Sequence, residues 1–153
     1  MRYPINLLIN SILLCMVGTS LSFARDIKTS EHDVAKEKIQ KVISHYMTGT
    51  FEANGELLKS VFHPSAVMNG FLGDKKLIGK PEVFIKDVTS KPSMKATGAA
   101  YKGEVTDIAV SGKIAAVVFE ETGFYGEGAF TNYFHLIEKD GDWKIISKTF
   151  TTK

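Results

Sequence analysis

Apolar residues recur at helical spacing in the first half of the chain. In the clearest stretch they fall three and four positions apart with polar residues between them, which is the pattern of an amphipathic helix with one buried face. A second, shorter segment stops before Pro64, because proline disfavours helical geometry in the residue that precedes it. Pro81 suits the first turn of a third segment. The predicted helices cover residues 30–49, 56–62 and 81–89.

The remaining segments alternate between apolar and polar positions, which is typical of strands. Two short strands are predicted first, joined by a tight turn, and residues 90–100 show no clear period and predict a loop. Four longer strands follow, separated by short glycine-containing turns that suit hairpins. The six predicted strands cover residues 66–72, 76–78, 103–111, 114–125, 128–139 and 142–151. Because helices come first and strands run consecutively at the end, the pattern predicts an α+β fold.

The first 24 residues have the features of a cleavable secretory signal. Arg2 precedes an apolar stretch at 5–18, and Ser22 and Ala24 place small residues where signal peptidase needs them. We therefore expect residues 1–24 to be removed and residues 25–153 to form one domain, periplasmic or secreted. After cleavage no attachment to the membrane is expected.

Two alternatives concern the same N-terminal segment. A retained membrane anchor would need about 18 or more apolar residues, whereas Asn6 and Asn10 interrupt this shorter run. A lipoprotein signal would end at Cys15, but the bulky Leu14 before it disfavours that cleavage. The secretory signal is therefore the preferred interpretation.

Charge and cysteine content restrict the classes of partner. Arg2 is the only charged residue of the signal, so 18 of the 19 basic residues face 17 acidic ones after cleavage. No basic stripe with interleaved aromatics occurs, which disfavours nucleic acid as a partner. Cys15 is the only cysteine, so the exported domain would hold neither a disulfide nor a zinc–thiolate site. The histidines lack metal-ligand spacing and no glycine-rich loop opens a helix, so we expect no metal and no cofactor.

Several short segments, ordered along most of the chain, match one known family. They are residues 43–49, 62–66, 105–118, 133–136 and 140–145 with Lys148. In these the chain resembles the nuclear transport factor 2-like superfamily, and within it the small bacterial proteins described as putative lumazine-binding. The resemblance covers about residues 31–151. It implies a cone, in which a strongly curved antiparallel sheet wraps around three N-terminal helices and leaves an apolar pocket between them. The superfamily contains isomerases, dehydratases and cyclases as well as binding modules without chemistry, so the fold alone does not give an activity.

Three polar residues in the first half of the chain are candidates for the pocket. Tyr46 lies on the apolar stripe of the first helix, so its hydroxyl must find an interior partner, either a ligand or a core group. His63 stands between a helix and a strand. The resemblance implies an ordering role for it at the pocket rim, and the residues alone leave a structural histidine bonded to nearby backbone or a general base. Asn69 is a polar residue that the strand at 66–72 offers, and that strand contains no acidic residue.

Alternation along residues 128–139 leaves two faces to choose between. Tyr133 and His135 share one face, while Asn132 and Phe134 lie on the other. If Tyr133 and His135 point inward, they form a polar cluster with Tyr46 in an apolar cavity; if they point outward, they belong to solvent or an interface. Strict alternation in the last strand separates Lys148 from Trp143 and Ile145, and we interpret Lys148 as a surface lysine.

The preferred function is an exported small-molecule-binding domain for a hydrophobic or aromatic ligand, dimeric through its outer sheet face. The candidate ligand-binding residues are Tyr46, His63, Asn69, Tyr133 and His135. No acid–base set is recognisable, because Asp107, the best remaining acid, lies far from His63 in sequence. One alternative is a lyase or isomerase acting on a hydrophobic carbonyl compound, with Tyr46 and His135 as acid and base. Another is a non-catalytic protein-interaction module that docks a partner on the exposed sheet face.

Overall fold

The computed structural model describes residues 19–153, and side chains from residue 31 onward. The chain divides into two units, Met1–Glu31 and His32–Lys153. The apolar stretch of the predicted signal, residues 5–18, lies outside the described residues, and residues 19–24 open the first helix. Among the helices in the described part, none is both long enough and apolar enough to cross a membrane.

Four helices occur in the described residues, one more than the pattern predicts. They are α1 (Thr19–Phe51), α2 (Gly55–Val61), α3 (Pro81–Thr89) and α4 (Met94–Thr97). Helix α1 begins before Ser30, because neither glycine nor proline interrupts residues 19–48. The side chain of Asn54 caps α2 by accepting the Leu57 N–H at 3.0 Å. Helix α3 has the predicted bounds, whereas α4 adds one turn, capped by Ser93, inside the predicted loop.

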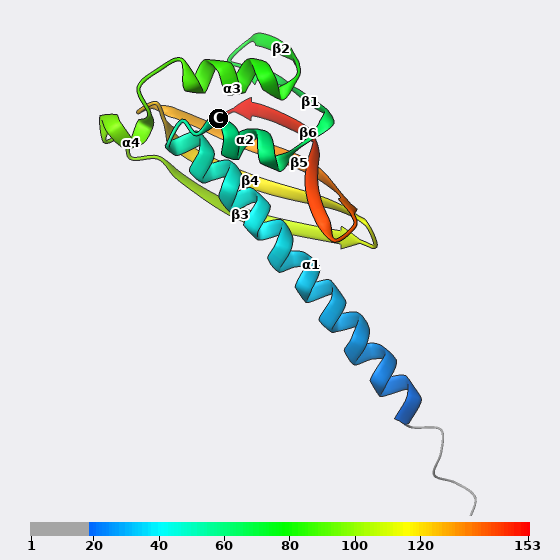
Figure 1. Ribbon diagram of the computed structural model, residues 1–153. Coiled ribbons are helices and arrows are strands. Elements are labelled where there is room, and N and C mark those ends of the chain that lie inside the picture. The colour runs from blue at the N-terminus through cyan, green and yellow to red at the C-terminus, as the bar shows by residue number, and fades with distance from the viewer. Residues whose placement is uncertain (1–18) are drawn as a thin grey trace, which may run out of the picture. The chain divides into compact units, whose positions relative to one another are not determined.

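The six strands form one curved sheet that the helices cover on one face (Figure 1). They are β1 (Phe62–Leu72), β2 (Lys75–Gly79), β3 (Lys102–Ser111), β4 (Ile114–Phe124), β5 (Gly128–Lys139) and β6 (Asp142–Thr152), in the order β2-β1-β6-β5-β4-β3. The predicted α+β cone is thus confirmed. The sheet is mixed in one pairing, because β1 runs parallel to β6. These two strands are not joined by a hairpin, so no tight turn forces them to be antiparallel.

A β-bulge in β6 changes which face its later residues take. Leu136 of β5 pairs with Ile145, but the next pair joins His135 to Ser147, so Ile146 is an extra residue. An extra residue reverses the alternation beyond it. Lys148 therefore lies on the same inner face as Ile145 and is only 3% exposed. The interpretation of Lys148 as a surface lysine is wrong.

Strand β5 has no such irregularity among its central residues, and its two faces are clearly separated. Asn132, Phe134 and Leu136 are buried against the helices. Tyr133 is 51% exposed, and His135 is exposed with it on the outer face. The face left open by the sequence is thus assigned: the inner surface of β5 consists of Asn132, Phe134 and Leu136, with Phe130 preceding them.

Candidate functional site

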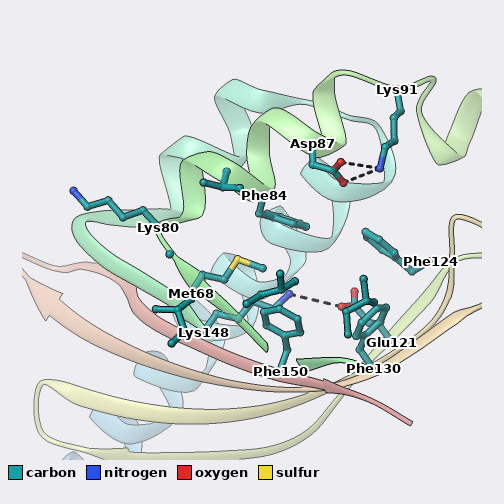
Figure 2. Close-up of a pocket in the computed structure, with 15 residues that line it drawn as sticks. Met68, Lys80, Phe84, Asp87, Lys91, Glu121, Phe124, Phe130, Lys148 and Phe150 are labelled. Atoms are coloured by element: carbon teal, nitrogen blue, oxygen red, sulfur yellow. Dashed lines mark hydrogen bonds and ion pairs between the residues drawn. The ribbon is translucent and has the colours of Figure 1, made fainter. Parts of the chain in front are cut away.

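A cavity of about 430 Å³ opens on the inner face of the sheet, bordered by α3 and the β1–β2 hairpin. Its walls are mainly apolar (Figure 2). Phe84 projects from α3, and Phe124, Phe130 and Phe150 come from three strands of the sheet. The cavity thus presents aromatic surface from both layers, as pockets for flat apolar ligands do.

Close packing of β1 against β6 positions one of these rings. A Cβ atom at Gly70 would lie 2.1 Å from the carbonyl oxygen of Phe150 and 2.7 Å from its ring. Only glycine leaves room for that approach. Met68, two residues earlier on β1, lines the cavity beside the Phe150 ring. The neighbouring strands therefore fix the shape of this wall.

Two charged side chains line the cavity although both are almost completely buried. Lys148 on β6 and Glu121 on β4 form an ion pair with Nζ 3.8 Å from Oε1, and their side chains are 4% and 3% exposed. Glu121 faces inward because β4 alternates regularly, with Val117 and Phe119 buried before it. Lys148 faces inward because of the bulge at Ile146. Strand β5 lies between them, so the pair spans two strand spacings of the sheet.

Tyr46 supplies the one hydrogen bond that Lys148 makes to the described residues. Lys148 Nζ donates to Tyr46 Oη at 2.5 Å, and Tyr46 is fully buried. The Tyr46 ring stacks on Phe84 at 5.9 Å between centroids and meets Phe134 edge-on at 5.0 Å. Burial and, secondarily, the Glu121 charge raise the pKa of Tyr46 well above its usual value. The phenol is therefore a neutral hydroxyl in the physiological pH range.

Glu121 is held from its other side by two donors. Tyr101 donates its hydroxyl to Oε2 at 2.6 Å, and Asn132 donates its amide to Oε1 at 3.0 Å. Asn132 also donates to the Phe119 carbonyl, and its own Oδ1 has no hydrogen-bond partner among the described residues. Burial, followed by the Glu121 charge, raises the pKa of Tyr101 above its usual range. Tyr101 and Asn132 thus hold the carboxylate of Glu121 in position by hydrogen bonds. Lys148 faces the same carboxylate at 3.8 Å, too far for a direct hydrogen bond.

The ammonium group of Lys148 is surrounded by aromatic rings. Its Nζ atom lies between 4.9 and 5.8 Å from the ring centroids of Tyr46, Phe84, Phe150 and Phe134. Burial lowers the pKa of Lys148 to about 8, and the Glu121 charge opposes that shift. At pH 7 roughly a tenth of such amines are neutral, a far larger share than for an exposed lysine. Lys148 can therefore act as a hydrogen-bond donor and, in its neutral form, as a base or nucleophile.

Of the five residues predicted for the site, the structure joins only Tyr46 to the cavity, through Lys148. His63 instead bonds locally, its Nδ1 accepting the Ser65 N–H at 3.1 Å with Ser65 Oγ at 2.7 Å. Asn69 accepts the Gly79 N–H at 3.2 Å beside the cavity without lining it. Tyr133 and His135 lie on the opposite face of the sheet.

Sequence reasoning missed Lys148 and Glu121. The regular alternation of β4 places Glu121 on the same face as Phe119. Neither the strand at 66–72 nor the exposed Asp107 supplies an acid to the cavity. Alternation assigns Lys148 to the outer face, because the bulge at Ile146 has no distinctive residue. Within residues 19–153, no three potential metal ligands gather at one place.

Comparisons with known proteins support the fold that this geometry indicates. The sequence model of the family described as "Putative lumazine-binding" matches residues 34–151. No curated protein matches the chain. Similar solved structures include two nuclear transport factor 2-like proteins of unknown function. The one from Shewanella baltica OS155 is 23% identical with a TM-score of 0.69, and the match covers 78% of this chain and 94% of that one. The one from Methylobacillus flagellatus KT is 25% identical with a TM-score of 0.70, and the match covers 78% of this chain and 92% of that one. A ketosteroid isomerase-like protein from Erwinia carotovora atroseptica SCRI1043 is more distant, at 17% identity and a TM-score of 0.54. That match covers 74% of this chain and 92% of the other.

Proposed function

The chain belongs to the family described as putative lumazine-binding, and from that premise we propose that its α+β domain binds a flat, largely apolar small molecule. The ligand lies between the Phe84 ring and the rings of the sheet. A carbonyl oxygen of the ligand accepts a hydrogen bond from Lys148, and an adjacent ring N–H donates to Glu121. Heteroaromatic lactams such as lumazine carry this pair of groups on one edge.

The size and lining of the cavity support this proposal. Its volume of about 430 Å³ falls within the range of roughly 300–1,000 Å³ that is usual for small-molecule sites. Four phenylalanine rings, Met68 and four aliphatic side chains supply most of the wall, the aliphatic ones being Leu72, Leu77, Ile78 and Val83. The exposed ion pair between Asp87 and Lys91 also lines the cavity. Flat apolar molecules gain most from such walls, because they bury their surface against rings.

The observation that carries the proposal is the incomplete satisfaction of Lys148. An ammonium group has three N–H donors, and Lys148 makes one hydrogen bond to the described residues while being 3% exposed. Burying a charge is costly unless its donors find partners. A ligand oxygen in the cavity would supply a further acceptor for Lys148. A bound ligand would therefore reduce the cost of keeping this ammonium group buried.

Calorimetric titration of the purified protein with lumazine tests the proposal. We expect Lys148→Met, which keeps an unbranched apolar stem and removes the ammonium group, to weaken binding at least about tenfold, since a hydrogen bond from a charged group is lost. Glu121→Gln should weaken it less, because the amide oxygen still accepts. Lys139→Met, at an exposed lysine that ends β5 and does not line the cavity, is the matched control and should bind as the wild type does.

A methylated ligand separates the two contacts. 1,3-Dimethyllumazine keeps both carbonyl groups and lacks the ring N–H donors, so it should bind the wild type more weakly than lumazine does. Glu121→Gln should change the affinity for the dimethyl compound less than it changes the affinity for lumazine, because only lumazine donates to residue 121. Equal binding of lumazine by the wild type and by a folded Lys148→Met variant would refute this assignment of the site. Binding of neither ligand by the wild type would refute the ligand class.

Export and dimerisation are further parts of the proposal. Residues 1–24 have signal-peptide features, and N-terminal sequencing of the protein from the periplasm or medium should begin at Arg25. Val67, Ile114 and Tyr133 leave apolar surface exposed on the outer face, at 42%, 59% and 51%. If two copies pair there, light scattering should give twice the monomer mass for the wild type and a lower mass for Ile114→Lys.

The alternative of a lyase or isomerase draws no support from its predicted pair. His135 lies on the outer face while Tyr46 is inside, so the two cannot act on one substrate. An interaction module would use the same outer face as the proposed dimer. The observations on the cavity favour small-molecule binding over both.

A further inference from the structure

Lys148 has the surroundings of a reactive amine rather than those of a structural cation. It lines a cavity, it is buried, and its neighbours are a phenol, a carboxylate and aromatic rings. We propose that Lys148 condenses reversibly with the carbonyl group of an aromatic aldehyde held in the cavity, forming an imine. The inference rests on the proposed binding site and adds covalent chemistry to it.

The nucleophile is available because burial favours the neutral amine. The lowered pKa of Lys148, about 8, leaves a usable fraction of free amine near neutral pH. The stem is fixed by the bulged strand, and its Nζ reaches the cavity beside Phe84 and Phe150, at 5.1 and 5.2 Å from their ring centroids. An aldehyde carbon attached to a flat ring that stacks on these phenyl groups would meet the amine nitrogen.

The two polar neighbours can move the protons that the condensation requires. Tyr46 Oη lies 2.5 Å from Nζ, and the nearest Glu121 oxygen lies 3.8 Å from it. Both groups are held in place by other contacts, Glu121 by Tyr101 and Asn132. They can therefore act as a proton donor and a proton acceptor without large rearrangement.

The chemistry balances without any oxidant, reductant or metal. The amine nitrogen attacks the aldehyde carbon, a C–N bond forms, and the carbonyl oxygen takes a proton from the Tyr46 hydroxyl. Glu121 accepts a proton from nitrogen. The C–O bond of the carbinolamine then breaks, and its oxygen leaves as water after taking the proton from Glu121. The iminium nitrogen gives its proton to the Tyr46 oxygen, which restores the hydroxyl. The products are one imine and one water from one amine and one aldehyde.

The ligand class follows from the walls of the cavity. Aromatic rings face it from α3 and from the sheet, so an aryl aldehyde should enter more readily than a short aliphatic one. Lys80 and Lys91 also line the cavity, but both are exposed. They therefore lack the burial that makes Lys148 distinctive.

Reductive trapping tests the inference on the full protein. The probe is 2-naphthaldehyde with sodium cyanoborohydride, and the readouts are intact mass and peptide mapping. We expect one predominant adduct, on Lys148, and a labelling rate that rises with pH around a midpoint near 8, the value of its lowered pKa. Lys148→Arg should abolish the adduct, whereas Lys102→Arg, an exposed lysine on β3 away from the cavity, should leave it unchanged.

A second variant and a competing ligand test the imine without relying on Lys148→Arg alone. Tyr46→Phe should slow trapping by about tenfold, because it removes the proposed proton donor together with the hydrogen bond that holds Lys148 Nζ. Excess 2-naphthoate should protect Lys148 in the wild type. Labelling spread evenly over exposed lysines, or no adduct on Lys148 while 2-naphthoate binds, would overturn the imine but spare the binding site. Failure of both 2-naphthoate and lumazine to bind would overturn the binding site as well.

Discussion

The inner face of the sheet has two halves that differ in how they are filled. One half is packed solid: Ile39 and Ile43 of α1 meet Leu136, Trp143 and Ile145, all at most 5% exposed. The other half, bordered by α3 and the β1–β2 hairpin, keeps a cavity with a buried ion pair in its wall. The packed half has the composition of a core. The open half retains charges that an apolar core would not need, which indicates that stability is not what selects them.

The largest expected loss of stability comes from truncating a side chain in the packed half. Phe134→Ala removes a fully buried ring that contacts Tyr46 and Phe119, and it should lower the free energy of unfolding by about 3–5 kcal/mol. Phe150→Ala, at the cavity, should lower it by roughly 1–2 kcal/mol because its neighbours already face open space. Urea denaturation measures both. Equal losses for the two variants would mean that the two halves are packed alike.

The buried pair should show a strong imbalance between its partners. Glu121→Leu leaves the Lys148 ammonium buried without a counter-charge and should cost about 3 kcal/mol. Lys148→Met also leaves a buried charge without its partner, but it should cost less than Glu121→Leu, because Glu121 keeps the donors Tyr101 and Asn132. In the double variant, the loss caused by Glu121→Leu should largely disappear. A double variant as unstable as Glu121→Leu alone would show that the pair is not coupled.

Stability should rise with pH on the alkaline side of neutrality. The folded pKa of Lys148, about 8, lies below its unfolded value of 10.5, so between these values the unfolded chain binds more protons. Stability must then increase as pH rises through that window, on the order of 2 kcal/mol in total. Above pH 10 the raised pKa values of Tyr46 and Tyr101 act in the opposite direction. Urea denaturation between about pH 7.5 and pH 9.5 measures the rise, because this range lies below the pH at which the tyrosines act. The rise should be absent in Lys148→Met. A rise that persists in this variant would mean that another group causes it.

The sequence predicts the open half less well than the packed half, for identifiable reasons. Helix α3 matches its predicted bounds because Pro81 marks its start, and the stripe that carries Tyr46 correctly places this residue inside. On β5, alternation defines two faces but not which one is inner, since Tyr133 and Phe134 are both aromatic. On β6, the extra residue at Ile146 cancels the alternation on which any assignment of Lys148 depends. The site thus rests on a register shift, which the pattern of residue types does not encode.

The central claim is that Lys148 is a buried amine aimed into a ligand cavity. The most direct measurement is the titration of its side chain by NMR, with lysine labelled at the ε carbon and Lys148→Met used for assignment. We expect Lys148 to titrate near pH 8 in the free protein. Its pKa should rise when lumazine saturates the site, because a new acceptor favours the charged form. A Lys148 that titrates near its unfolded value of 10.5, and that does not respond to lumazine, would contradict the claim.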